Sequence, residues 1–136
     1  MPSLANILVV DDEDIVCQSC RRVLTAEGHQ VSTALTGTEA LAKISSENFD
    51  VALVDLRIPG SGGLHLLRVM RRASPQTEVV VITGYPSLEN AKGAIQFGAY
   101  DYVTKPLAPH TLRAVVSQVL THKPWRIRKR CSHGPS

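Results

Sequence analysis

The fold is decided by the stretch Val51-Ala52-Leu53-Val54-Asp55, in which four apolar residues lead directly to a carboxylate. A short apolar run without polar alternation is typical of a strand buried on both faces, as in a parallel sheet. Residues 7–10 (Ile-Leu-Val-Val) repeat the pattern and lead to Asp11 and Asp12. Both runs are therefore predicted strands of a parallel sheet that carry acids at their carboxyl ends.

Two further strand ends carry the remaining polar groups. Residues 79–82 (Val-Val-Val-Ile) lead to Thr83, and residues 101–103 lead through Thr104 to Lys105. Ligands of open α/β sheets bind outside the carboxyl ends of the strands. The four strand ends would bring three carboxylates, a hydroxyl and an ammonium together at one edge of the sheet. We expect a phosphate-and-metal site there.

Helical patterns alternate with the strands along the chain. The predicted strands cover about residues 6–10, 30–34, 50–54, 78–82 and 101–103. The predicted helices cover about residues 13–27, 39–46, 64–73, 87–97 and 109–121. Alternating strands and helices with such short connections imply a parallel sheet with helices on both faces. We expect one α/β domain over residues 1–122.

The composition fits a single domain with an aliphatic core. The chain has 136 residues, of which 43% are hydrophobic and only 4% aromatic. Such a length is enough to bury a core. No apolar stretch approaches the roughly 18 residues that span a bilayer, and the N-terminus lacks the features of a signal peptide. The expected localisation is therefore cytoplasmic, with no membrane span.

The charge of the chain is unevenly placed. Twelve acids and ten of the fifteen Lys and Arg residues lie in residues 1–122. The other five bases lie in the acid-free last segment, and they are Lys123, Arg126, Arg128, Lys129 and Arg130. We expect residues 123–136 to be a basic tail or linker stub, and we favour a linker or disordered segment. Contact with nucleic acid or an anionic membrane surface is the less favoured alternative.

The spacing of Cys17 and Cys20 matches the C-x-x-C pattern of redox and zinc sites. A zinc site needs two further ligands at suitable spacing, and none is evident. We favour two residues of the first helix, whose apolar stripe would contain Val16, Cys20, Val23 and Leu24. Cys20 is then expected in the core and Cys17 closer to solvent.

Asp55 is the candidate phosphoacceptor. A carboxylate attacks phosphorus only when it is ionised, aimed, and relieved of repulsion by the phosphoryl oxygens. Asp11 and Asp12 would increase that repulsion, so they fit a site for Mg²⁺, a hard cation that prefers oxygen ligands. Lys105 would neutralise one phosphoryl oxygen, and the Thr83 hydroxyl would donate to another. Phosphoryl transfer needs mainly such positioning and charge neutralisation.

Taken together, these motifs resemble the receiver domain of response regulators in bacterial two-component signalling. The matching marks are Asp11-Asp12, Asp55 at the start of residues 55–59 with Gly63 closing the loop, Thr83, and residues 102–106. The likeness runs from about Asn6 to about Leu120. The resemblance implies a flavodoxin-like, doubly wound five-stranded parallel sheet with strand order 2-1-3-4-5 and five helices.

The resemblance also implies how the site is built. Asp12 and Asp55 would ligate Mg²⁺ directly, the backbone carbonyl of Arg57 would add a third protein ligand, and Asp11 would act largely through water. The bond between Lys105 and the following proline is expected to be cis, with the lysine amine directed at Asp55; cis bonds are essentially confined to such positions.

The same resemblance implies a switch and its partners. Tyr102 would turn inward when Thr83 moves toward the phosphoryl group. The change would alter the surface formed by the fourth helix, the fifth strand and the fifth helix. The implied phosphodonor is a sensor histidine kinase or phosphotransfer domain. An output domain, an effector protein or a homodimer through that surface would receive the signal, and transcriptional output is favoured.

Two other functions remain open from the sequence. The first is a haloacid-dehalogenase-type, Mg²⁺-dependent aspartyl phosphohydrolase, for which Asp12 and Asp14 have the right spacing. However, Asp14 falls inside the first predicted helix, and no residues are left for a cap domain. The second is a receiver-like interaction module that is never phosphorylated, which the intact set of candidate site residues disfavours. We therefore expect a signalling phosphoacceptor that catalyses only its own phosphorylation and dephosphorylation.

Overall fold

The computed structural model describes residues 5–58 and 62–133, with the backbone alone for residues 123–133. Its centre is a five-stranded parallel sheet in the order β2-β1-β3-β4-β5. The strands are β1 (Asn6–Val10), β2 (Gln30–Ala34), β3 (Val51–Asp55), β4 (Glu78–Thr83) and β5 (Asp101–Thr104). The order is the one that the resemblance implied, so the predicted fold class is confirmed.

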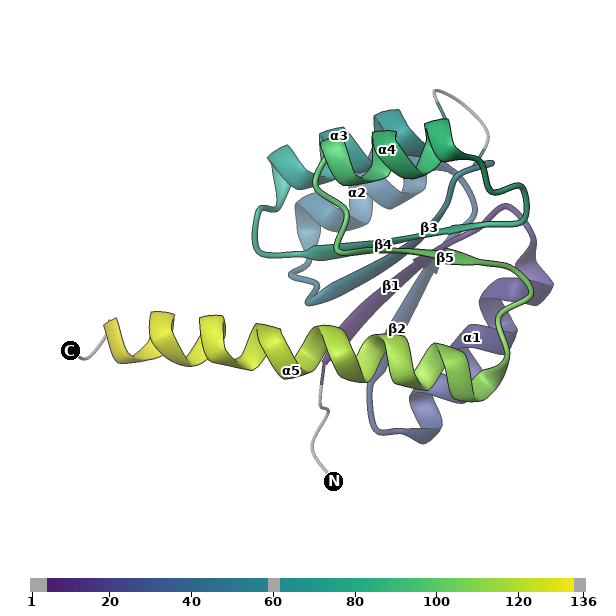
Figure 1. Ribbon diagram of the computed structural model, residues 1–136. Helices are drawn as coiled ribbons and strands as arrows, with labels where there is room; N and C mark the ends of the chain where they lie inside the picture. Colours follow the sequence, from purple (N-terminus) through teal and green to yellow (C-terminus); the bar gives the residue numbers. More distant parts are fainter. Residues whose placement is uncertain (1–4, 59–61, 134–136) are drawn as a thin grey trace.

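The described residues form five helices, which cover the two faces of the sheet (Figure 1). They are α1 (Asp14–Ala26), α2 (Gly37–Ser46), α3 (Gly63–Ala73), α4 (Leu88–Gln96) and α5 (Pro109–His133). Helices α2, α3 and α4 lie on one face, and α1 and α5 lie on the other (Figure 1). The helix α4 begins within one residue of the predicted start, and the Ser87 hydroxyl accepts a hydrogen bond from the Asn90 backbone N–H at 3.0 Å. The arrangement is a doubly wound α/β domain.

The central strands form the core because their side chains alternate between two apolar layers. The layer under α2, α3 and α4 receives Leu8, Val10, Ala52, Val54, Val79 and Val81. The layer under α1 and α5 receives Ile7, Val9, Val51, Leu53, Val80 and Ile82. Burying one such side chain contributes about 1.5–3 kcal/mol. Both faces of the central strands are therefore anchored, and their carboxyl ends are held in fixed register.

The fifth helix is longer than the sequence indicated. The predicted end was Thr121, but α5 continues to His133 through the basic segment and extends away from the domain (Figure 1). Lys and Arg are good helix formers, and no glycine lies within Pro109–His133, although Pro124 falls inside the helix and has no backbone N–H to donate there. The favoured disordered segment is thus wrong for the backbone of residues 123–133. Its role as a tail or linker stays a prediction.

The position of Cys17 also differs from expectation. Both Cys17 and Cys20 are buried in α1, and neither forms a disulfide. The Cys17 thiol donates to the backbone carbonyl of Asp11 at 3.4 Å. Burial raises the pKa of each thiol to about 11. The stripe of α1 that faces the core is therefore wider than predicted and includes Cys17, whose spacing to Cys20 and Leu24 is three and seven residues.

Gly63, the first residue of α3, has no room for a side chain. An added Cβ would lie 2.4 Å from the Leu56 Cα and 2.9 Å from the Asp55 carbonyl oxygen. We expect Gly63→Ala to lower the free energy of unfolding by about 1–3 kcal/mol, because backbone atoms must shift. Gly37→Ala is the matched control, since its Cβ would meet Leu66 at an ordinary 3.7 Å.

Urea unfolding monitored by circular dichroism would compare the two variants with the wild type. Equal urea midpoints of unfolding for Gly63→Ala and wild type would show that the contact of Gly63 with the end of β3 is not tight.

Residues 59–61 of the predicted loop between Asp55 and Gly63 lie outside the described residues.

Candidate functional site

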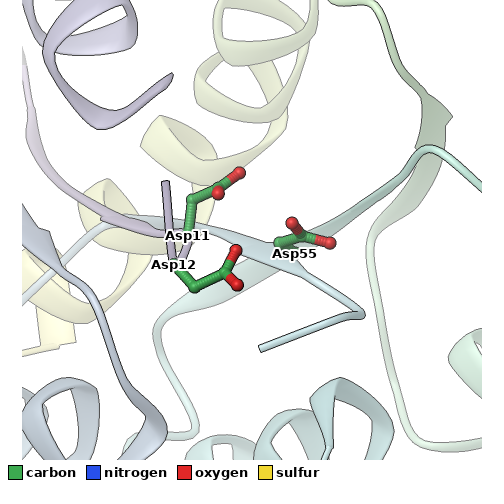
Figure 2. A group of neighbouring side chains, drawn as sticks. All are labelled: Asp11, Asp12 and Asp55. Atoms are coloured by element: carbon green, nitrogen blue, oxygen red, sulfur yellow. The ribbon is translucent and has the colours of Figure 1, made fainter. Parts of the chain in front are cut away.

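Three carboxylates meet at the carboxyl edge of the sheet (Figure 2). Asp11 and Asp12 directly follow β1, and Asp55 is the last residue of β3. Because these two strands are paired in the sheet, each of the three side chains can offer an oxygen, and these oxygens all lie within 4.8 Å of one another. Asp11 and Asp55 are buried, at 3% and 5% exposure, whereas Asp12 is exposed. The group is thus open to solvent on the Asp12 side.

Lys105 reaches the same point from the end of β5. Its Nζ donates to Asp11 Oδ2 at 2.8 Å and to Asp55 Oδ2 at 2.9 Å. Its backbone N–H donates to the Thr83 carbonyl at 2.8 Å, which ties the residue to β4. The bond from Lys105 to Pro106 is cis, as the resemblance implied, and the amine is directed at Asp55.

The charges of this group influence one another. Burial raises the pKa of Asp11, although its hydrogen bonds from Lys105 and from the Glu13 backbone oppose the change. Burial alone would lower the pKa of Lys105, but the bonds and charges of Asp11 and Asp55 outweigh it and raise that pKa. Lys105 therefore stays cationic. One ammonium against the carboxylates of Asp11, Asp12 and Asp55 leaves a formal charge of −2, which suits a divalent cation.

Both oxygens of Asp55 are held in place. Oδ1 accepts a hydrogen bond from the Arg57 backbone N–H at 2.9 Å, and Oδ2 accepts from Lys105. The Leu56 N–H donates a hydrogen bond to the Ile82 carbonyl at 3.0 Å, so the turn after β3 is fixed to β4. A carboxylate with both oxygens engaged presents a defined direction to an incoming electrophile.

Thr83 lies beside this group without joining it. The residue is fully buried at the end of β4, and its Oγ1 accepts a hydrogen bond from the Tyr85 N–H at 3.0 Å. Among the described residues, it makes no hydrogen bond to the three carboxylates. Tyr102 is also nearby in the fold, and its hydroxyl accepts from the Ser87 N–H at 3.2 Å. Tyr102 is thus linked to the segment between β4 and α4.

A stacked pair borders the exposed side of the site. The Arg57 guanidinium lies 4.4 Å from the centre of the Tyr85 ring, a cation–π distance. The pair borders a cavity of about 410 Å³ that Asp12, Asp55 and Lys105 also line. The sequence showed that Arg57 and Tyr85 each stand two residues past a strand-end residue. It gave no signal that the two side chains would stack, since that depends on the conformations of two separate loops.

Known sequences that resemble this chain agree with the geometry of the site. The sequence profile of the response regulator receiver domain matches residues 7–117. The chain is a member of that family. Its receiver domain is 37% identical over 115 residues to "Alginate biosynthesis transcriptional regulatory protein AlgB" of Pseudomonas aeruginosa, with 85% of the chain and 26% of that protein covered. The chain spans about a quarter of the length of this curated relative.

Solved structures of receiver domains share the fold closely. A CheY-like response regulator receiver domain protein from Methanospirillum hungatei is 35% identical, with a TM-score of 0.88 over 91% of this chain and 99% of that one. A response regulator protein from Burkholderia pseudomallei is 27% identical, with a TM-score of 0.78 over 94% of this chain and 74% of that one. That structure carries a phosphorylated aspartic acid, a calcium ion and citrate.

Proposed function

We propose that this receiver domain accepts a phosphoryl group on Asp55 from the phosphohistidine of a sensor histidine kinase or phosphotransfer domain. The observation that carries the proposal is the fixed Asp55 carboxylate, with Lys105 at 2.9 Å and two further acids beside it. The phosphorylated aspartic acid of the Burkholderia protein supports the same chemistry. In the step itself, an Asp55 oxygen forms a bond to phosphorus while the bond from phosphorus to the histidine nitrogen breaks.

The donor set fits Mg²⁺. The three carboxylates supply hard oxygen ligands, and together with Lys105 they carry a formal charge of −2, which matches the cation. Asp12 and Asp55 would bind it directly, the Arg57 carbonyl would complete the protein ligands, and Asp11 would contribute through water. Bound there, the cation would supply positive charge to the phosphoryl oxygens and relieve their repulsion with Asp55. The calcium ion in the Burkholderia structure is consistent with a divalent cation in this family.

Lys105 and Thr83 would complete the phosphoryl site. The Lys105 ammonium, now shared by Asp11 and Asp55, would exchange part of this contact for a phosphoryl oxygen. The Thr83 hydroxyl would rotate from its bond with the Tyr85 N–H to donate to another oxygen. The Tyr102 hydroxyl accepts a hydrogen bond from the Ser87 N–H, in the segment that follows Thr83. A movement of Thr83 would therefore be passed to Tyr102 through this short segment. Tyr102 would then turn inward.

The switch would change the surface formed by α4, β5 and α5, and this surface would contact the output partner. In α4, the large apolar side chains of Leu88 and Ile95 are each 73% exposed, so they are available for contact with a partner or a second copy of the chain. The transcriptional role in the name of AlgB favours transcriptional output.

Cytoplasmic localisation fits the family and stays a prediction. Within the described part of the chain, no helix is both long and apolar enough to cross a bilayer.

Acetyl phosphate with Mg²⁺, followed by intact-protein mass spectrometry, tests the proposal against its alternatives. A receiver domain should gain one phosphoryl group, which persists after the donor is removed and then decays. A haloacid-dehalogenase-type phosphohydrolase would instead release phosphate from added phosphomonoesters in many turnovers. A module that is never phosphorylated would gain no mass. Either of the last two results would reject the proposed function.

Replacing Lys105 should slow phosphorylation strongly. We expect Lys105→Met to reduce the rate of labelling by acetyl phosphate by about 10²-fold, because a charge aimed at the phosphoryl group is lost from a partly buried site. Lys92→Met, at an exposed position of α4 outside the site, is the matched control. Equal labelling rates for Lys105→Met and Lys92→Met would remove Lys105 from the proposed mechanism.

The stacked pair should lengthen the lifetime of the phosphorylated form. Arg57 and Tyr85 border the cavity beside Asp55, and neither offers a carboxylate or amide to hold a hydrolytic water in line. We expect Arg57→Asn and Tyr85→Glu to speed dephosphorylation by about tenfold, since each supplies such a group. Tyr85→Phe keeps the ring and should decay like the wild type.

The lifetimes would be measured by mass spectrometry after removal of the free phosphodonor. If Arg57→Asn and Tyr85→Glu decay no faster than wild type, the pair does not control access of water. A slow wild-type decay would suit transcriptional signalling better than motility control.

A further inference from the structure

Cys17 connects the apolar core to the turn that carries two of the three acids. The residue is fully buried in α1, in the apolar layer between that helix and the sheet. Its thiol donates to the backbone carbonyl of Asp11, with Sγ at 3.4 Å, and the Ala34 carbonyl lies farther away at 4.0 Å. Burial raises the pKa of the Cys17 thiol to about 11, so at neutral pH the thiol keeps its proton and stays a donor.

The carbonyl that Cys17 contacts belongs to the peptide that joins Asp11 to Asp12. A peptide unit is planar, so the direction of the Asp11 carbonyl also sets the direction of the Asp12 N–H and the positions of the two Cα atoms. The two carboxylates thus branch from the two ends of the unit that the thiol holds. Both belong to the group whose oxygens lie within 4.8 Å of one another.

The other hydrogen bonds of Asp11 hold different parts of the residue. Its backbone N–H donates to the Ala34 carbonyl at 3.1 Å. Its Oδ1 accepts from the Glu13 N–H at 2.9 Å, and its Oδ2 accepts from Lys105 at 2.8 Å. Among the described residues, no backbone N–H donates to the Asp11 carbonyl. Because Asp11 is only 3% exposed, loss of the thiol would leave this carbonyl unpaired and poorly accessible to water.

We propose that Cys17 is a positioning residue of the metal and phosphoryl site, whose thiol fixes the peptide between Asp11 and Asp12 and thereby both carboxylates. The inference rests on the proposed function, because these carboxylates are the proposed Mg²⁺ site. Cys17 touches neither the cation nor the phosphoryl group, and it acts through the backbone of the acids. Hydrogen bonds that orient the groups around a metal commonly set its affinity.

Cys20 provides a matched comparison within the same helix. It is also a free, buried cysteine, at 6% exposure, and in the described part of the chain its thiol donates no hydrogen bond to Asp11. Alanine removes a buried sulfur at either position, whereas serine offers a hydroxyl donor at either position. We therefore compare Cys17→Ala and Cys17→Ser with Cys20→Ala and Cys20→Ser. A role in core packing alone would give the same pattern at both positions.

The first readout needs no metal. In a ¹H–¹⁵N NMR spectrum, the ¹⁵N shift of the Asp12 amide responds to a hydrogen bond on the carbonyl of the same peptide. Cys17→Ala should move the Asp12 signal farther from its wild-type position than Cys20→Ala does. Cys17→Ser should return the signal toward the wild type, because its hydroxyl can donate to the Asp11 carbonyl. The two Cys20 variants should not differ from each other in this signal.

The second readout is the dissociation constant of Mg²⁺, measured by calorimetry on variants that circular dichroism shows to be folded. Cys17→Ala should bind Mg²⁺ at least about threefold more weakly than Cys20→Ala, the effect of one modest hydrogen bond. Cys17→Ser should bind more tightly than Cys17→Ala. Cys17→Val keeps apolar volume without a donor, so it should resemble Cys17→Ala and serves in its place if the smaller side chain unfolds the domain.

Three results would overturn the proposal. Equal Asp12 shifts and equal Mg²⁺ affinities in Cys17→Ala and Cys20→Ala would make Cys17 a core residue only. A displaced Asp12 signal with unchanged Mg²⁺ affinity would show that the hydrogen bond forms but does not position the acids. Absence of Mg²⁺ binding by the wild type would reject the proposed metal site and this role with it, and it is recognised without any Cys17 variant.

Discussion

Asp55→Asn is expected to abolish phosphorylation by acetyl phosphate and by a partner phosphohistidine. The amide oxygen can still accept the hydrogen bond from the Arg57 N–H, so the turn after β3 should keep its shape. The amide is a poor nucleophile, however, and its NH₂ group would face the Lys105 ammonium in place of the acceptor Oδ2. The variant should therefore fold and show no phosphoryl adduct by intact-protein mass spectrometry.

A matched control comes from the first turn of α1. Asp14→Asn makes the same chemical change at an exposed position, and it should be phosphorylated at the wild-type rate. Circular dichroism would confirm that Asp55→Asn is folded. A phosphoryl adduct that persists in folded Asp55→Asn would mean that another residue accepts the group.

Removal of the divalent cation should have the second-largest effect. Asp11, Asp12 and Asp55 offer oxygens within 4.8 Å of one another, and Lys105 pairs with Asp11 and Asp55. A phosphoryl group would add further negative charge at the same point. We therefore expect chelation of Mg²⁺ to slow labelling by at least about 10²-fold, since the charge is then uncompensated in a partly buried site.

Asp12→Asn tests the same role within the protein. Asp12 is exposed, so the change should not unfold the domain, but it should weaken Mg²⁺ binding as measured by calorimetry. Mg²⁺ should also raise the melting temperature of the wild type more than that of Asp12→Asn, because a ligand that binds the folded state stabilises it. Asp14→Asn again serves as the control. Labelling of chelated protein at the Mg²⁺-loaded rate would contradict the metal role.

The sequence was sufficient for most of the fold because the central strands are buried on both faces. Their uninterrupted apolar runs, such as residues 51–54 and 79–82, have few other interpretations, and each was found as a strand. The end of α5 was not predictable in the same way. Its extension past Thr121 runs through Pro124, a residue that disfavours a helix interior, and the basic segment has no apolar pattern to mark a helix.

The site could be predicted as a set of strand ends but not as a set of contacts. Asp11, Asp12, Asp55 and Lys105 meet because parallel strands bring their carboxyl ends to one edge. Their roles in metal binding and phosphoryl transfer stay proposals that rest on this geometry and on the family. The stacking of Arg57 on Tyr85 could not be predicted, since side-chain contacts between loops depend on backbone conformations that periodicity does not encode.

Location of the phosphoryl group in the wild-type protein tests the central proposal most directly. The protein would be phosphorylated with acetyl phosphate and Mg²⁺ and then reduced with borohydride, which converts an aspartyl phosphate to homoserine. Peptide mass spectrometry would locate the modified residue. The proposed function predicts homoserine at position 55 and unmodified aspartate at positions 11 and 12. Homoserine at either of those positions, or at none of the three, would contradict it.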